Sequence, residues 1–132
     1  MEERKIKQGD IYYADLPDKT EGSVQAGRRP VLITQCNELN KNSTTYIVAT
    51  VTSQLKRLDY KFHVLLPRMK GLPKQSMVLA EQRMTVSKDQ LIEYRCSVHN
   101  TTMKKVYKAI AETEHLKRKN LFRHRKHKGK YK

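Results

Sequence analysis

The stretch of residues 44–52, Thr-Thr-Tyr-Ile-Val-Ala-Thr-Val-Thr, constrains the fold more than any other part of the chain. β-Branched side chains are stiff and pack well on a pleated surface, so this stretch predicts a strand long enough to lie centrally in a sheet. Shorter β-prone runs separated by Pro, Gly and other turn-forming residues predict further strands. These runs are residues 10–16, 30–36, 60–66 and 76–81, the last continued by 83–86 after a bend.

One helix is predicted after the strands. Asn100 or Thr101 can cap its first turn with a short polar side chain, and apolar residues then recur at helical spacing. That stripe consists of Met103, Val106, Tyr107, Ile110 and Ala111. A shorter helical turn is expected at 88–92. Because strands and helices do not alternate, the order predicts a mainly β fold: a mostly antiparallel sheet that curls into a small barrel, with a C-terminal helix.

Positive charge dominates the chain and is concentrated at its end. The 132 residues carry 28 Lys and Arg against 13 Asp and Glu, a formal net charge of +15. Residues 117–132 hold nine of the basic residues and no acidic one, whereas residues 1–116 hold all the acids and have a net charge of +6. We therefore expect one folded domain at 1–116 and a basic, flexible tail at 117–132. The charge of the domain and that of the tail both indicate a polyanionic partner, and nucleic acid is the first candidate.

Several classes of protein are excluded by the sequence. Apolar runs are too short for a membrane span, and the N-terminus lacks the apolar region of a secretory signal, so we expect a cytoplasmic protein without a membrane partner. Cys36 and Cys96 fit neither a disulfide framework nor a zinc site. The five histidines do not lie at metal-ligand spacing. No metal and no other cofactor is therefore expected.

A metal-free group of polar side chains is predicted near two strand ends. Arg28 and Arg29 follow a long polar loop, and Thr50, Thr52 and Ser53 lie at the end of the central strand. A guanidinium group is a planar fork of donors that suits phosphate, and a nearby hydroxyl group can help to hold a phosphodiester. RNA supplies its own nucleophile, the 2′-hydroxyl group. Neighbouring Tyr12 and Tyr13 alternate in direction, so one is expected in the core and the other is available to stack on a base.

At these residues the chain resembles the MazF/PemK family of toxin–antitoxin ribonucleases. Four segments match the family in order: residues 7–16 (basic-x-Gly-Asp-apolar-Tyr-x-Ala-Asp-Leu), 22–33 (Gly-Ser-x-Gln-x-Gly-x-Arg-Pro-Val-Leu-apolar), 44–52 and 76–82 (Ser-x-apolar-apolar-x-Glu-Gln). The resemblance implies an SH3-like, CcdB-like barrel that forms a homodimer. It also implies metal-independent cleavage of single-stranded RNA, leaving a 2′,3′-cyclic phosphate and a 5′-hydroxyl. The resemblance also implies a cognate antitoxin as the protein partner. The complex of the two proteins is expected to bind DNA.

The resemblance also assigns roles to residues. The family's catalytic arginine, in Gly-x-Arg-Pro, falls on Arg29, and its catalytic threonine falls on Thr52. Arg29 is expected to bind the phosphate and take part in proton transfer, and Thr52 to hold the scissile phosphate and the attacking hydroxyl group. The residues expected to bind substrate around them are Ser23, Gln25, Arg28, Ser53 and Gln82.

One departure from the family pattern bears on specificity. The family usually continues Glu-Gln-x-Arg-Thr, whereas the run here is Glu81-Gln82-Arg83-Met84-Thr85. The arginine comes one position early, so its side chain should point to the opposite face unless a bulge intervenes. Two other functions stay open at this point: a non-catalytic gyrase inhibitor of the CcdB type, and a basic nucleic-acid-binding module without activity.

Overall fold

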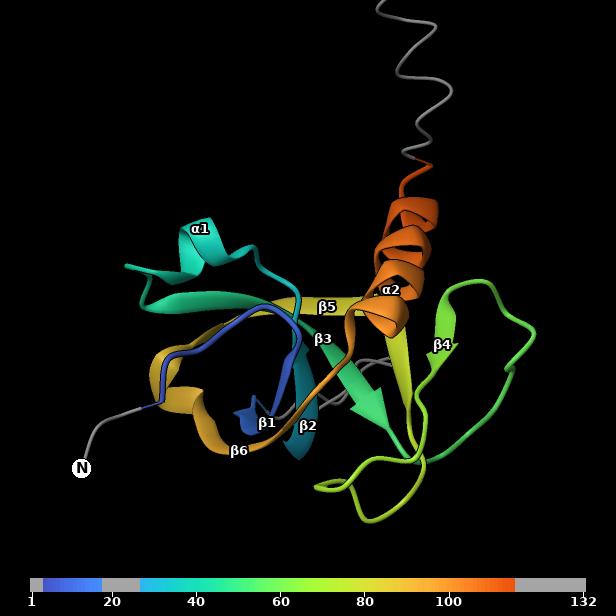
Figure 1. Cartoon of the computed structure of the whole chain (residues 1–132), viewed down its shortest axis with the longest axis horizontal. Helices are drawn as coiled ribbons and strands as arrows, with labels where there is room; N and C mark the ends of the chain where they lie inside the picture. Colours follow the sequence, from blue (N-terminus) through green and yellow to red (C-terminus); the bar gives the residue numbers. More distant parts are fainter. Residues whose placement is uncertain (1–3, 18–26, 116–132) are drawn as a thin grey trace, which may run out of the picture.

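The computed structural model describes residues 4–17 and 27–115 of the chain (Figure 1). The strands are β1 (Asp10–Leu16), β2 (Gly27–Ile33), β3 (Thr45–Thr52), β4 (His63–Leu65), β5 (Met77–Ser87) and β6 (Leu91–Ser97). The helices are α1 (Asn37–Asn40), the 3₁₀ turn η1 (Lys88–Gln90) and α2 (Asn100–Thr113). The predicted class, mainly β with a C-terminal helix, is confirmed.

The six strands form one antiparallel sheet in the order β4-β5-β3-β2-β1-β6. The predicted barrel is not closed, because in the described part of the chain the edge strands β4 and β6 do not pair with each other. The segment between β4 and β5 and helix α2 pack beside this opening, and Leu66, Leu72 and Met103 contribute to one core cluster there. Side-chain packing therefore covers the gap between β4 and β6 that backbone hydrogen bonds would close in a complete barrel.

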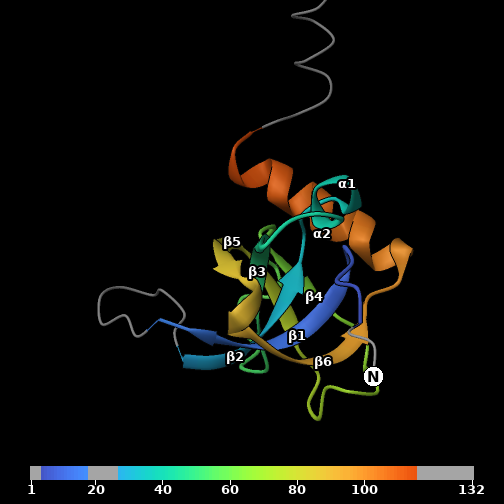
Figure 2. The same cartoon turned by 90° about the vertical axis from the view of Figure 1, so that its left-hand side faces the viewer.

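Apolar side chains cover both faces of the sheet. On one face, residues such as Leu32 and Val51 pack against α2, which lies across the sheet in Figures 1 and 2. On the other face, Val31, Val48 and Val86 form a second cluster. Since β3 contributes alternate residues to the two clusters, the stretch that dominates the sequence is buried on both sides, as its composition predicts.

Two predictions about the C-terminal helix are wrong in detail. The N-cap is His99, whose Nδ1 accepts a hydrogen bond from the Thr101 backbone N–H at 3.2 Å, rather than Asn100 or Thr101. The buried stripe contains Met103 and Val106 but not Tyr107, which is 41% exposed. Ala109 takes its place, so the buried side chains of the helix are Met103, Val106 and Ala109, three residues apart.

The strand boundaries differ from the predicted ones at three places. Strand β2 begins at Gly27 rather than Pro30, and Pro30 lies just outside the β2–β3 ladder, where a missing N–H group is tolerated. Only residues 63–65 of the predicted strand at 60–66 join the sheet. Strand β6 was not predicted, because this mixed polar edge strand has neither strict alternation nor an apolar run. The predicted helical turn at 88–92 is the 3₁₀ turn η1.

In the residues that the structure describes, no helix is long and apolar enough to span a bilayer. The predicted basic tail at 117–132 and the loop residues Ser23 and Gln25 lie outside these residues.

Candidate active site

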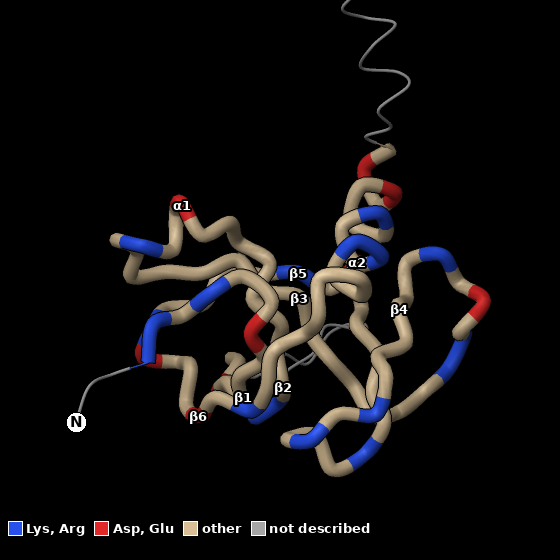
Figure 3. Tube along the Cα trace, in the orientation of Figure 1, with Lys and Arg blue, Asp and Glu red and all other residues tan. Residues whose placement is uncertain are grey.

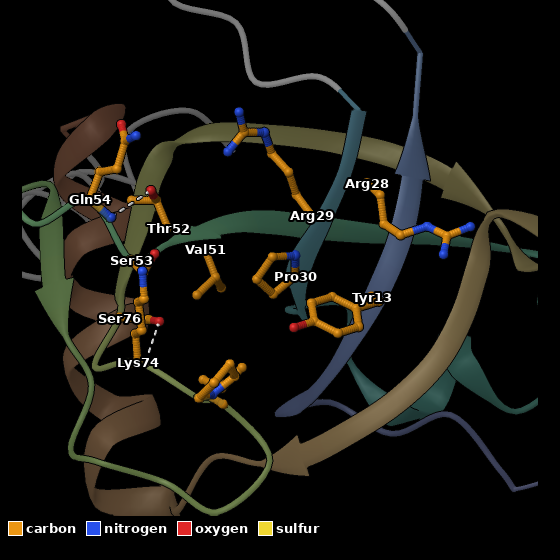
Figure 4. A pocket seen from close by; sticks show the side chains of 12 residues that line it. Tyr13, Arg28, Arg29, Pro30, Val51, Thr52, Ser53, Gln54, Lys74 and Ser76 are labelled. Atoms are coloured by element: carbon orange, nitrogen blue, oxygen red, sulfur yellow. Dashed lines mark hydrogen bonds between the residues drawn. The ribbon is translucent and has the colours of Figure 1, made fainter.

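A cavity of about 320 Å³ lies where β2 begins and β3 ends (Figure 4). Its lining comes from β1, β2, the end of β3 and the segment that leads into β5. The lining residues are Tyr13, Arg28, Arg29, Pro30, Val51, Thr52, Ser53, Gln54, Leu72, Pro73, Lys74 and Ser76. The structure thus brings together four residues that the sequence predicted for the site: Arg28, Arg29, Thr52 and Ser53.

The sheet register explains why the predicted catalytic pair meets. Strands β2 and β3 pair Ile33 with Val48 and Val31 with Thr50 in antiparallel register. This ladder ends at the Val31–Thr50 pair, so Arg29 and Thr52 each lie two residues beyond its last pair. Two positions 23 apart in the sequence therefore both line the cavity at which these strand ends lie.

Thr52 presents a hydroxyl group whose hydrogen-bonding capacity is only partly used. The residue is 8% exposed, and its Oγ1 accepts a hydrogen bond from the Gln54 backbone N–H at 3.1 Å. A hydroxyl group also has a proton to donate, and no described residue accepts it. The turn after β3 therefore fixes the position of the Thr52 hydroxyl oxygen, and the hydroxyl proton is available to donate to a ligand.

The two arginines of β2 are oriented differently. Arg29 is half-buried, and in Figure 4 its side chain extends on the side of β2 that faces the end of β3. Arg28 points the other way in the same view, toward β1, where its Nε lies 3.9 Å from Asp15 Oδ1. Both groups of that pair are 65% exposed. The orientation favours Arg29 as the phosphate ligand at the centre, with Arg28 at the edge.

Electrostatically the site is cationic. Arg28, Arg29 and Lys74 line the cavity, and no carboxylate does so among the described residues. The segment between β3 and β5, residues 53–76, adds five Lys and Arg besides Lys74 and has Asp59 as its one acidic residue. Figure 3 shows basic positions spread along the loops between β3 and β5. Such a surface attracts the phosphates of a polynucleotide and steers it toward the cavity.

Sequence reasoning missed several lining residues. Gln54, Lys74 and Ser76 come from loops whose path depends on the tertiary fold, so no local pattern identifies them. Ser76 is buried, with its Oγ donating to the Lys74 carbonyl at 2.9 Å, and so shapes the loop. The alternation of the tyrosines did contain a signal: Tyr12 is in the core, and Tyr13 lines the cavity.

A bulge lies directly before the position at which the chain departs from the family pattern. Strand β5 pairs with β3 in two registers, and Ala80, Glu81 and Gln82 form an excursion where one changes to the other. After it, Arg83 turns to helix α2 and donates to Thr113 Oγ1 at 3.1 Å and Glu114 Oε2 at 2.8 Å. Gln82 is half-buried in the bulge and does not line the cavity. Arg83 therefore joins the sheet to the helix.

Among the described residues, His, Cys, Asp and Glu side chains form no group of three or more that could hold a metal ion. The chemistry available at the cavity is that of guanidinium, ammonium, hydroxyl and amide groups. These groups bind phosphate oxygens and stabilise charge that develops on them.

The antiparallel sheet with one C-terminal helix, and the cationic cavity lined by an arginine and a threonine from neighbouring strand ends, define a small β protein with a site suited to anions. Within this class, the match to a known protein family identifies the chain further. Residues 7–113 match the family described as "PemK-like, MazF-like toxin of type II toxin-antitoxin system", and the chain belongs to this family.

Two known proteins of similar sequence are named endoribonucleases. Endoribonuclease MazF of Staphylococcus saprophyticus is 39% identical over 106 residues, which cover 80% of this chain and 88% of that protein. Endoribonuclease EndoA of Bacillus subtilis is 36% identical over 106 residues, covering 80% of this chain and 90% of that protein.

Solved structures agree on the fold. A crystal structure of MazF from Deinococcus radiodurans superposes with a TM-score of 0.72 at 21% identity, covering 84% of this chain and 97% of that one. A mycobacterial endoribonuclease in complex with its cognate antitoxin gives 0.70 at 25% identity, covering 85% and 97%.

Proposed function

We propose that this toxin-family protein is a sequence-selective endoribonuclease that cleaves single-stranded RNA, mRNA above all, and thereby inhibits translation. The observation that carries the proposal is the cavity at which Arg29 and Thr52 meet from facing strand ends. The relatives named endoribonucleases cover four-fifths of the chain and support the same activity. A gyrase inhibitor or a passive binding module would have no need of this pair.

The proposed reaction is an internal displacement at phosphorus. The 2′-oxygen of one ribose bonds to the phosphorus atom of its own 3′-phosphate, and the bond from phosphorus to the next 5′-oxygen breaks. The products are a 2′,3′-cyclic phosphate and a 5′-hydroxyl. The proton that leaves the 2′-hydroxyl is balanced by the one that the 5′-oxygen gains, so no water is consumed in this step.

The residues contribute to that reaction in different ways. The Arg29 guanidinium binds the non-bridging oxygens while negative charge builds on them and takes part in proton transfer. Thr52 donates its free hydroxyl proton to the scissile phosphate and keeps the attacking group in line. Arg28, Ser53 and Lys74 hold the strand at the rim of the cavity. Ser23 and Gln25, which precede β2 in the sequence, remain predicted substrate ligands, and so does Gln82.

The proposal includes the partners expected of such a toxin. RNA is the substrate, a cognate antitoxin is the inhibitor, and the active form is a homodimer in the cytoplasm, where mRNA is found. The mycobacterial neighbour was solved with its antitoxin, which supports that partnership.

The test is incubation of purified protein with RNA in the presence of EDTA. We expect cleavage, with 5′-hydroxyl ends that polynucleotide kinase labels without prior phosphatase treatment. Arg29→Ala should lower the rate by roughly 10²–10³-fold or more, because one charge-stabilising donor group is lost. Lys41→Ala is the matched control, since it also removes one positive charge, at an exposed position on the opposite end of the sheet.

Intact RNA at micromolar wild-type protein would reject the nuclease function and leave the gyrase inhibitor or the binding module. Cleavage by Arg29→Ala at the wild-type rate would show that the active site lies elsewhere.

A further inference from the structure

The cavity is lined by two chemically different kinds of side chain. Arg28, Arg29, Thr52, Ser53, Gln54 and Lys74 provide charged or polar groups, whereas Tyr13, Pro30, Val51 and Leu72 provide an apolar wall. Figure 4 shows Tyr13 beside Pro30, across the cavity from Thr52 and Ser53. A nucleotide has the same division, since its phosphate is charged and its base presents a flat π face.

The ring of Tyr13 contacts an arginine that does not itself line the cavity. The guanidinium carbon of Arg95, on the neighbouring strand β6, lies 5.0 Å from the centroid of the Tyr13 ring. This distance is within the range of a cation–π contact. Arg95 thus supports the ring from β6.

Arg95 is itself fixed by two hydrogen bonds. Its Nε donates to the Gly71 carbonyl at 2.8 Å, and its Nη1 donates to Glu93 Oε2 at 3.0 Å. Glu93 in turn lies opposite Tyr13 in the β1–β6 ladder. The guanidinium plane is therefore oriented by the strand that faces the tyrosine and by the loop before β5.

Gly71 permits this arrangement. Its φ is +103°, and a Cβ atom built there would lie 2.2 Å from the Arg95 carbonyl oxygen, so any other residue would push the loop away. The same loop provides Leu72, Pro73 and Lys74 to the cavity. Arg95 therefore positions the aromatic ring and the opposite loop relative to each other.

We infer that Tyr13 and Pro30 form a nucleobase subsite, with Tyr13 as the stacking platform and Arg95 as its positioning residue. The inference rests on the proposed function and names the part of the substrate that this wall binds. A ring fixed in advance loses little freedom when a base stacks on it, so the base of a nucleotide beside the scissile phosphate binds there.

The test compares two single-stranded probes by fluorescence anisotropy. One is a 2′-O-methyl RNA dodecamer of random sequence, which cannot be cleaved because its 2′-oxygens are blocked. The other is an abasic tetrahydrofuran dodecamer, which keeps the phosphates and lacks the bases. Tyr13→Leu should weaken binding of the base-bearing probe roughly 5- to 150-fold, the range for loss of one stacked base, and leave the abasic probe unchanged. Tyr13→Phe keeps the ring and should bind both probes like wild type.

Arg95→Lys retains the charge and loses the fork, and we expect a several-fold loss on the base-bearing probe only. The matched control is Arg83→Lys, since Arg83 also joins two elements through its guanidinium but lies away from the cavity. It should lower the melting temperature without changing the ratio of the two affinities. An equal loss on both probes in Tyr13→Leu, or none on either, would overturn the subsite. Failure of wild-type protein to cleave RNA would reject the proposed function instead.

Discussion

Buried polar side chains at the two ends of the sheet differ in how completely they are hydrogen-bonded. At the end where β1 begins, Asp10 is 2% exposed, and its carboxylate accepts from Ser97 Oγ at 2.8 Å and from the Lys7 backbone N–H at 3.0 Å. Beside it, the Gln35 amide donates to Asn40 Oδ1 at 2.9 Å. The Asn40 amide donates back to the Gln35 carbonyl at 2.9 Å.

The end where β3 stops is different. Thr52 accepts one hydrogen bond and donates none to the described residues. Two residues earlier on the same strand, Thr50 is fully buried, and its Oγ1 has no hydrogen-bond partner among them. An unpartnered buried polar group costs about 1–3 kcal/mol, so the hydrogen bonds of Asp10, Gln35 and Asn40 stabilise the fold at their end of the sheet, which we call the saturated end for these three side chains. At the other end the Thr52 hydroxyl keeps its proton for a ligand, whereas the Thr50 hydroxyl is buried.

This comparison predicts that a hydroxyl group at the β3 end can be removed with a large effect on activity and a small one on stability. Thr52→Val keeps the shape of the side chain, and we expect kcat to fall by about 10²-fold, because one donor to the phosphate is lost. Thr52→Ser should retain most of the activity. Urea denaturation should show a change of less than about 1 kcal/mol in the free energy of unfolding for either variant. Substantial unfolding of Thr52→Val would instead assign the residue a structural role.

At the saturated end the effects should be reversed. Asp10→Ala leaves the hydrogen-bond donors around the carboxylate unpaired, and we expect the free energy of unfolding to fall by about 2–3 kcal/mol. Asp15→Ala is the control on the same strand, because that carboxylate is 65% exposed. It should change stability by less than about 0.5 kcal/mol. The kcat of the folded fraction of Asp10→Ala should match that of wild type. A large drop in kcat would show that the hydrogen bonds of Asp10 also affect the active site.

The contrast also shows what the sequence could predict. The central strand, the C-terminal helix and the meeting of Arg29 with Thr52 followed from β-branched density, helical spacing and the resemblance, which are local or motif-level signals. The saturation of Asp10 could not be predicted, because its partner Ser97 comes from β6, the one strand without a clear local pattern.

The same limit applies to the site. Lys74 and Ser76 reach the cavity only because Gly71 lets a loop approach β6, and this depends on a contact between distant segments. The open barrel edge has the same cause, since strand closure is decided by which side chains fill the gap between β4 and β6. Local propensity carries no information on either point.

A smaller effect is expected at Thr50. Replacing the unpartnered hydroxyl with a methyl group in Thr50→Val removes a buried polar group at nearly constant volume. We expect the free energy of unfolding to rise by about 1 kcal/mol. Thr45→Val, at an exposed position of the same strand, should change stability by less than half as much. A loss of stability in Thr50→Val would mean that the hydroxyl group is hydrogen-bonded in solution.

The smallest effect concerns the pH dependence of stability at the saturated end. Burial raises the pKa of the Cys96 thiol above its usual 9.0; the charge of nearby Arg95 opposes the rise, and that of Asp10 adds to it. The folded protein therefore keeps this proton at a pH where the unfolded chain loses it, so the free energy of unfolding falls as the pH rises above about 9. The slope for one group is at most about 1.4 kcal/mol per pH unit.

Cys96→Ala should remove this component from urea denaturation curves at pH 8–10, whereas Cys36→Ala, at an exposed cysteine, should not. Equal slopes in wild type and Cys96→Ala would show that folding leaves the pKa of the thiol unchanged and that water reaches Cys96 in the folded protein.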